Sequence, residues 1–265
     1  MDKRPIGILD SGIGGLTVVN AVKRRMPNEA AIYFGDTARV PYGGKDRETL
    51  TGYGREIIKF LIEKDVKAVV VACGTLSSNA YDTLKKEFDL PMVDVLRPGI
   101  DACAELKPKR VGFIATEATV RRGLFSSLLK EKLPGAEVFE RACPLFVPIA
   151  EEGCTKNPVA RTMAEVYLEG WIDLKLDAVV LGCTHYPLYS NMLREILGGV
   201  KFIDLSDWAA AAAEIALKEN NLFNESNIVN KNENYTFYVS GDPEKFDATA
   251  ESILGFEVTA QKINL

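Results

Sequence analysis

The sequence predicts an α/β fold made of two similar α/β domains, each built on a mainly parallel central sheet. Three observations lead to this prediction. Short valine-rich segments alternate with amphipathic segments along the 265 residues, which is the pattern of βαβ units. The alternation begins again near residue 98. Residues 68–75 (AVVVACGT) and 178–185 (AVVLGCTH) also share one plan, in which a strand buried on both faces leads to a cysteine.

The first part of the chain alternates regularly between strands and helices. A glycine-rich turn joins the first strand to its helix, and Pro27-Asn28 ends that helix because these residues favour turns. We expect strands at residues 6–9, 31–34, 68–72 and 92–96, and helices at 16–26, 46–64 and 78–88.

The second part repeats this order, and the last segment then returns to the first domain. Residues 144–153 (PLFVPIAEEG) are predicted to form a loop, and Asp207 or Ser206 to cap a helix. The resulting domains are residues 1–97 plus 207–265, and residues 98–206. We expect strands at residues 110–115, 137–142, 178–181, 202–205, 235–239 and 256–260, helices at 98–106, 118–133, 158–174, 188–197, 208–218 and 243–254, and a surface loop at 220–234.

The composition indicates a reduced, cytoplasmic enzyme. A formal net charge of −5 gives no electrostatic reason to expect nucleic acid or an anionic membrane as a partner. No apolar stretch approaches the roughly 20 residues that a membrane span needs. The first residues lack the apolar region of a signal peptide. The chain has five cysteines, an odd number without close pairs, so a disulfide framework is not expected.

Two of the cysteines stand out because each ends a predicted strand and precedes polar residues. A free cysteine is usually a small buried hydrophobic residue, which suits Cys103, Cys143 and Cys154. Cys73 and Cys183 fit that description less well. In open α/β sheets, ligands bind at the carboxyl ends of strands, which is where these two thiols are expected.

Three kinds of chemistry are compatible with these thiols. A zinc site is disfavoured and no metal is predicted, because there is no C-x-x-C pair and His185 is the single histidine. A Cys–His acyl-transfer pair, Cys183 with His185, leaves Cys73 without a role. Two facing thiols instead suit the inversion of a carbon centre, which needs a base on one face and an acid on the other. A thiol with a pKa of about 8.5 serves in both forms near neutral pH.

Carboxylates and an imidazole lie within reach to tune the thiols. Asp10 is expected to serve Cys73, and His185 with Glu151 or Glu152 to serve Cys183. The threonines and small residues beside each cysteine offer hydroxyl and backbone N–H groups to a substrate carboxylate.

The turn Asp10-Ser11-Gly12-Ile13-Gly14-Gly15 resembles a dinucleotide fingerprint only poorly. The sixth position of G-x-G-x-x-G is Thr17, and the Asp10 carboxylate would repel a pyrophosphate at the helix N-terminus. Two interpretations of Asp10 stay open. Either Asp10 or Ser11 is only an N-cap, or Asp10 receives a substrate ammonium or orients a thiol.

Taken together, these motifs resemble the bacterial glutamate racemases. The resemblance runs in order over nearly the whole chain and includes the glycine turn, Pro41-Tyr42-Gly43, the turn at Cys73, residues 151–153 and the highly specific GCTHYPL at 182–188. It implies an active site in the cleft between the two domains. It also implies cofactor-independent, two-base racemisation of glutamate, which supplies D-glutamate for peptidoglycan, and a homodimer is expected.

The resemblance assigns roles by position. Cys73 and Cys183 become the acid/base pair, assisted by Asp10, His185 and Glu151. The residues expected to bind or line the substrate site are Asp10, Ser11, Pro41, Tyr42, Gly43, Gly74, Thr75, Thr116, Thr119, Thr184 and His185.

One position departs from the family pattern. The family commonly has Cys-Asn-Thr-Ala at the first cysteine, whereas this chain has Cys73-Gly74-Thr75-Leu76. The Gly74 backbone N–H or a water would then replace the lost amide contact, and Gly74→Asn is expected to lower KM for glutamate. The alternatives to a glutamate racemase are a racemase of aspartate or another small acidic substrate, a non-catalytic binding relative, and a Cys–His hydrolase.

Overall fold

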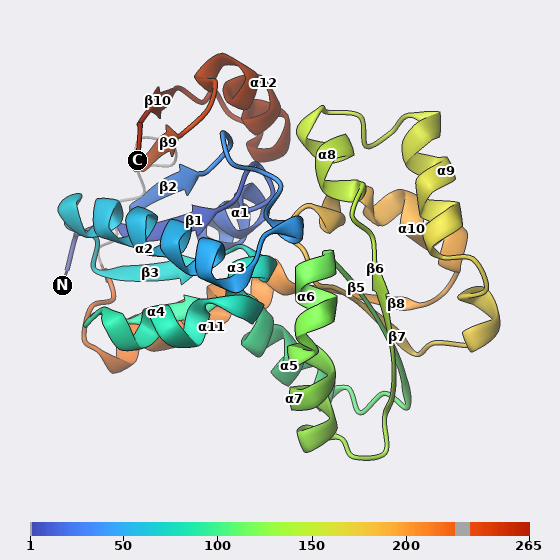
Figure 1. The fold of residues 1–265 in the computed structure, drawn as a ribbon. Helices are drawn as coiled ribbons and strands as arrows, with labels where there is room; N and C mark the ends of the chain where they lie inside the picture. The colour runs from blue at the N-terminus through green and yellow to red at the C-terminus, as the bar shows by residue number, and fades with distance from the viewer. Residues whose placement is uncertain (1, 226–233) are drawn as a thin grey trace.

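The computed structural model describes residues 2–225 and 234–265, which fold around two separate sheets (Figure 1). One sheet has six strands in the order β10-β9-β2-β1-β3-β4, and the other has four in the order β6-β5-β7-β8. Every strand pair is parallel. We call the two parts the six-stranded half and the four-stranded half. The predicted α/β class with mainly parallel sheets is confirmed.

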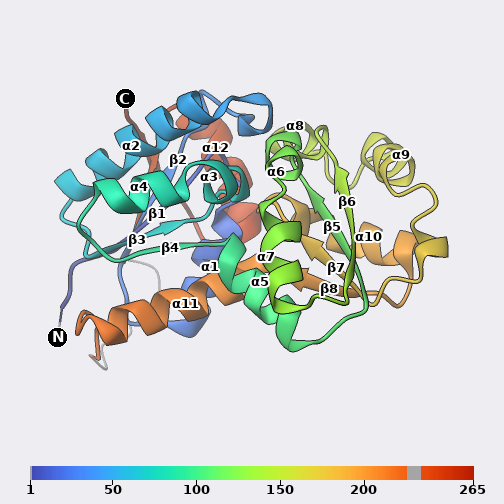
Figure 2. The ribbon, with the colours of Figure 1, turned by 60° about the horizontal axis from the view of Figure 1, so that its bottom comes forward.

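The six-stranded half is a sheet covered by helices on both faces. Valine residues of β3 alternate between two cores, with Val69 and Val71 in one and Val70 in the other, as expected for a strand buried on both sides. Helices α2 and α4 cover one face, and α1 and α11 cover the other (Figure 2). The elements of this half are β1 (Ile6–Asp10), α1 (Leu16–Arg25), β2 (Ala31–Gly35), α2 (Arg47–Glu63), β3 (Ala68–Val71), α3 (Gly74–Asn79), α4 (Tyr81–Glu87), β4 (Met92–Asp94), α11 (Leu205–Glu219), β9 (Tyr235–Val239), α12 (Pro243–Leu254) and β10 (Ala260–Lys262).

The four-stranded half has the same layered plan. Helices α5 and α7 pack on one face, in a core that continues through α11 into the other half, while α8, α9 and α10 pack on the opposite face. This half contains α5 (Leu96–Glu105), β5 (Arg110–Ala115), α6 (Glu117–Arg122), α7 (Leu124–Lys132), β6 (Glu137–Ala142), α8 (Phe146–Glu151), α9 (Pro158–Tyr167), β7 (Ala178–Leu181), α10 (Ser190–Leu197) and β8 (Lys201–Asp204).

Several predicted helices are shorter or divided. The helix expected at 118–133 is two helices, because Gly123 has φ +65° and interrupts the right-handed turn. The helix expected at 158–174 ends at Tyr167, and Gly170 has φ +74° before a short 3₁₀ turn, Ile172–Leu174. The helix expected at 78–88 begins earlier and is divided, so that α3 starts directly after Cys73.

Three further expectations are wrong. The predicted loop 144–153 contains α8, which buries Phe146, Val147 and Ala150 and so gains tertiary support that its sequence does not reveal. Neither Asp207 nor Ser206 caps α11, since the Asp204 side chain accepts the backbone N–H of Ser206. The last strand lies at 260–262 instead of 256–260.

The predicted loop 220–234 lies largely outside the described residues. None of the helices in ranges 2–225 and 234–265 is both long and apolar enough to cross a membrane.

Candidate active site

The carboxyl ends of β1 and β3 meet those of β5 and β7 at the junction of the two halves. Cys73 follows β3 and Cys183 follows β7, and both side chains are buried, with exposed fractions of 4% and 6%. Parallel strands place their carboxyl ends at one sheet edge, so the two halves bring these edges face to face. The two strand ends with cysteines therefore belong to one site.

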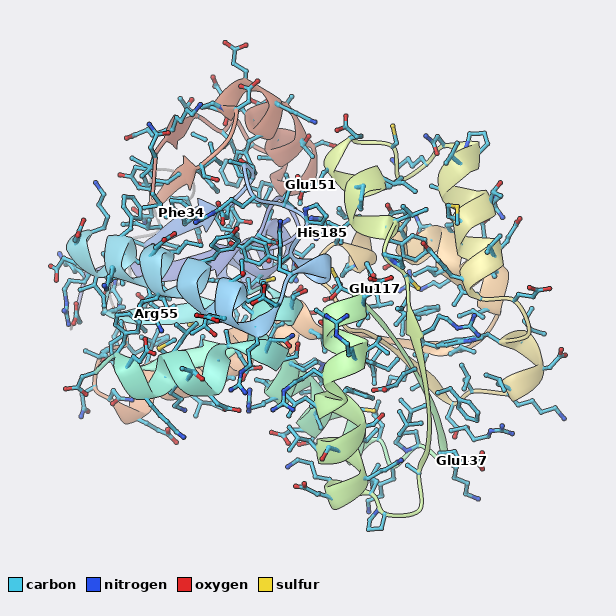
Figure 3. All side chains as sticks on the ribbon, viewed as in Figure 1. Phe34, Arg55, Glu117, Glu137, Glu151 and His185 are labelled. Atoms are coloured by element: carbon cyan, nitrogen blue, oxygen red, sulfur yellow. The ribbon has the colours of Figure 1, made fainter. Side chains whose placement is uncertain are left out.

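Cys183 is linked to an imidazole and a carboxylate. Its Sγ lies 3.7 Å from Nδ1 of His185, and His185 Nε2 lies 2.6 Å from Oε1 of Glu151 on α8. Figure 3 shows Glu151 and His185 together at the junction. Burial lowers the pKa of His185, but its hydrogen bonds with Cys183 and Glu151 outweigh burial and raise that pKa well above its ordinary value. The imidazolium form is thereby favoured beside the thiol.

The choice between two adjacent glutamates is decided by the fold. Glu152 points to the surface, where its carboxylate pairs with Lys245 of α12 at 2.8 Å. Glu151 points inward, and its Oε1 accepts both His185 and the backbone N–H of Ile13, the latter at 2.9 Å.

Cys73 has a different environment. Its Sγ lies 3.7 Å from the hydroxyl oxygen of Ser11, with no imidazole beside it. Burial, with a further contribution from the nearby Asp10 charge, raises the pKa of the Cys73 thiol to about 12. Cys73 is therefore a neutral thiol at neutral pH, and the two half-sites are chemically unequal.

Asp10 connects the glycine turn to the other half of the molecule. Its Oδ2 accepts the backbone N–H groups of Gly12 at 3.2 Å and Gly15 at 3.0 Å. Its Oδ1 accepts the hydroxyl of Thr184 at 3.2 Å. Burial raises the pKa of the Asp10 carboxyl. The cap residue of α1 is Gly15, so neither Asp10 nor Ser11 is simply its N-cap.

A row of hydroxyl groups crosses the junction. Oγ1 of Thr116 lies 2.9 Å from Oγ1 of Thr75 and 2.9 Å from Oγ1 of Thr119. Ser78 adds a fourth hydroxyl, 3.4 Å from that of Thr119, which sequence reasoning missed. Ser78 lies one helical turn after Thr75, so the two hydroxyls share a helix face. The helix was predicted to begin at residue 78 instead of 74, and the pairing was therefore not seen.

The Pro41-Tyr42-Gly43 segment reaches the junction through its backbone. Tyr42 begins a short 3₁₀ turn, Tyr42–Gly44, and its buried hydroxyl donates to Asp36 within the six-stranded half. Asp36 also accepts the hydroxyl of Ser240 at 2.6 Å, which anchors the segment from β9. Asp36 was missed as a site residue, although its place at the end of the second predicted strand was a signal. Gly43 packs against Thr116 of the other half, whereas Pro41 is exposed.

The expected benefit of Gly74→Asn is wrong on steric grounds. A Cβ placed on Gly74 would collide with the backbone carbonyl oxygen of Gly182 and lie 3.3 Å from its carbon. Gly74 does not have a positive φ, so glycine is needed here for space and not for conformation. An asparagine side chain has no room unless the halves move apart.

The arrangement suits chemistry on two faces of one atom. Two thiols approach from opposite sheets, one beside an imidazole and the other beside a hydroxyl, and further hydroxyl groups lie at the same junction. The predicted residues that meet at the junction are Asp10, Ser11, Gly43, Cys73, Gly74, Thr75, Thr116, Thr119, Glu151, Cys183, Thr184 and His185.

Comparison with known proteins agrees with this geometry. The profile of the Asp/Glu/Hydantoin racemase family matches residues 16–213. A glutamate racemase from Geobacter metallireducens is 42% identical over 257 residues, which cover 96% of this chain and 94% of that protein.

Solved structures give the same result. A crystal structure of glutamate racemase from Francisella tularensis in complex with D-glutamate has a TM-score of 0.91 at 39% identity, covering 100% of this chain and 98% of that one. An aspartate racemase from Picrophilus torridus shares the fold alone. Its structure has a TM-score of 0.61 at 17% identity, covering 83% of this chain and 94% of that one. The chain therefore belongs to the Asp/Glu/hydantoin racemase family, in its glutamate racemase branch.

Proposed function

We propose that this protein interconverts L-glutamate and D-glutamate with Cys73 and Cys183 as the two acid/base groups. The observation that carries the proposal is the meeting of the two strand-end thiols at one buried junction, each with its own polar partner. The glutamate racemases among its relatives support glutamate as the substrate.

In the direction from L-glutamate, the Cys183 thiolate removes the proton from Cα. The imidazolium of His185, 3.7 Å away and held by Glu151, stabilises that thiolate. The electron pair left on Cα is shared with the substrate carboxylate. The Cys73 thiol then delivers its proton to the opposite face, which gives D-glutamate and leaves Cys73 as the thiolate. The reverse direction uses the same groups in exchanged roles.

The remaining residues bind and orient the substrate. In this proposal Asp10, which accepts the Thr184 hydroxyl, and Ser11 face the ammonium group, while the hydroxyls of Thr75 and Thr116 donate to the carboxylates. Donors placed where negative charge develops lower the barrier because they need no reorganisation during the reaction.

The wider setting belongs to the same proposal. We propose a cytoplasmic homodimer without a cofactor that provides D-glutamate for peptidoglycan, with domains of residues 1–97 plus 207–265 and 98–206. The five cysteines are free thiols, which agrees with a reducing compartment.

Racemisation in D2O tests the two-base mechanism. The proton removed from Cα goes to one thiol, and the deuteron delivered comes from the other, which has exchanged with solvent. Early product from either enantiomer should therefore carry deuterium at Cα, while the remaining substrate carries almost none. A single base acting on both faces would return some of the original proton to the product.

Serine variants provide the matching control. Cys73→Ser and Cys183→Ser should each abolish inversion, because a serine hydroxyl is far too weak an acid and base at neutral pH. Cys183→Ser should retain at most proton removal from D-glutamate, at Cys73. Full racemase activity in either variant, or early product with its original proton, would contradict the proposal. Turnover of D-aspartate measured beside D-glutamate checks the substrate.

A further inference from the structure

Four glycines of the six-stranded half lie directly against residues of the four-stranded half. A Cβ on Gly12 would lie 2.8 Å from Cδ of Glu151, and one on Gly14 would lie 2.6 Å from Oγ1 of Thr184. A Cβ on Gly43 would lie 2.8 Å from Cβ of Thr116. A Cβ on Gly74 would strike the carbonyl oxygen of Gly182. All four contacts cross the junction, and a Cβ on Gly74 would also lie 3.7 Å from Cα of Cys183.

Backbone conformation does not explain these glycines. Among the described residues, the glycines with positive φ are at other positions, namely 123, 153, 170, 198 and 255. The four glycines are thus needed because a second backbone or side chain occupies the space that a Cβ would take. We call Gly12, Gly14, Gly43 and Gly74 the glycine seam.

We propose that the glycine seam sets how closely the two halves approach, and that this approach both seals the two thiols from solvent and fixes their separation. The second consequence rests on the proposed racemase function, whereas the sealing does not. The burial of the two thiols and the distance between them are linked, because the contacts of the glycine seam lie near Cys73 and Cys183, whose side chains are almost fully buried.

The four contacts differ in how easily they would yield. The carboxylate of Glu151 is the end of a flexible side chain and can rotate away from Gly12. The Cβ of Thr116 and the backbone of Gly182 cannot rotate away, so the halves themselves must separate. A Cβ on Gly43 would lie 2.8 Å from Cβ of Thr116, whereas ordinary van der Waals contact is 3.4–4 Å. The two halves would therefore have to move apart by about 1 Å. A misplacement of about 1 Å can reduce a catalysed rate by about 10²-fold.

The chain supplies a matched pair of variants. Gly43 and Gly44 are neighbours in the same 3₁₀ turn, neither has a positive φ, and a Cβ on Gly44 would meet nothing within 4 Å. Gly43→Ala should increase the distance between the two halves, and Gly44→Ala should leave the junction unchanged.

The first measurement is the rate at which iodoacetamide alkylates individual cysteines, followed by peptide mass spectrometry at one pH. In Gly43→Ala, Cys73 and Cys183 should react at least about tenfold faster than in the parent protein. In Gly44→Ala they should react at the same rate as in the parent protein. Cys103, which has no exposed surface, reports loss of the whole fold and should stay unreacted in both variants.

The second measurement is turnover from both enantiomers. Gly43→Ala should lower kcat by about 10²-fold, with kcat/KM reduced equally from L- and D-glutamate because the two interconvert with an equilibrium constant of one. Gly44→Ala should match the unmodified enzyme.

Equal labelling and equal turnover in the two variants would overturn the inference. Should Cys103 also react in Gly43→Ala, that variant has lost its fold, and Gly74→Ala decides the matter by the same criteria. An unmodified protein that does not racemise glutamate would remove the proposed function, while the labelling comparison would still decide whether the seam seals the thiols.

Discussion

Replacing Glu151 by glutamine removes one negative charge from the site with little change in shape. Oε1 of Glu151 lies 2.6 Å from His185 Nε2 and accepts the Ile13 N–H at 2.9 Å. A glutamine oxygen retains both hydrogen bonds, so the main loss is the charge that favours the imidazolium. Hydrogen bonds to charged groups contribute about 1.5–3 kcal/mol, against about 0.5–1.5 for neutral ones, so the expected loss is about 1–2 kcal/mol.

Converted to a rate, this loss predicts a fall in kcat from L-glutamate of about 5- to 30-fold. The rate is measured by following the circular dichroism signal of L-glutamate or D-glutamate as it decays. The value of kcat/KM should fall by the same factor in the two directions. Since Glu151 raises the pKa of His185, its removal lowers that pKa, and the alkaline loss of activity should begin at a lower pH.

Glu152→Gln is the control for this prediction. Glu152 is exposed and pairs with Lys245 at the surface, where such a pair contributes only about 0–1 kcal/mol, so turnover should change less than twofold. A normal kcat in Glu151→Gln, or an equal loss in Glu152→Gln, would refute the assignment of Glu151 as the partner of His185.

Three further outcomes are expected. Asp10→Asn should slow turnover strongly while the melting temperature changes little, because asparagine can still accept the Gly12 and Gly15 N–H groups; normal turnover would leave Asp10 a purely structural role. Thr184→Val should lower the urea-derived unfolding free energy by about 1–3 kcal/mol, because Oδ1 of buried Asp10 loses its donor; an unchanged value would mean that this bond is not formed. The fold raises the pKa of the Cys73 thiol to about 12, so the thiol's contribution to the unfolding free energy is complete below its unfolded pKa and is lost as pH rises through about 9 to 12. The unfolding free energy of Cys73→Ser should therefore decline less steeply at alkaline pH, and a decline identical to that of the parent protein would contradict this.

The sequence by itself determined the elements whose signals are local. Valine-rich strands that end at Cys73 and Cys183 are visible as short apolar runs followed by polar residues, and strand ends of parallel sheets meet at one edge whatever else the chain does. The Asp10 turn is likewise contained within a few residues. The fold class and the pair of thiols could therefore be predicted.

Helix ends were predicted less well, because they depend on single residues and on packing. Gly123 and Gly170 interrupt helices that the apolar pattern alone would continue. Helix α8 forms in a segment that was predicted to be a loop, since burial of Phe146 and Val147 outweighs its weak local preference.

Only the tertiary structure decided how the site is assembled across the junction. Glu151 and Glu152 are adjacent and chemically identical in the sequence, and the direction of the last turn of α8 decides which one reaches His185. Gly74 appears in the sequence as a missing side chain, yet the fold fills its place with the backbone of Gly182. The Glu151–His185 contact joins two segments of the four-stranded half that are 34 positions apart in the chain, and the Gly74–Gly182 contact joins the two halves. No local pattern encodes such contacts.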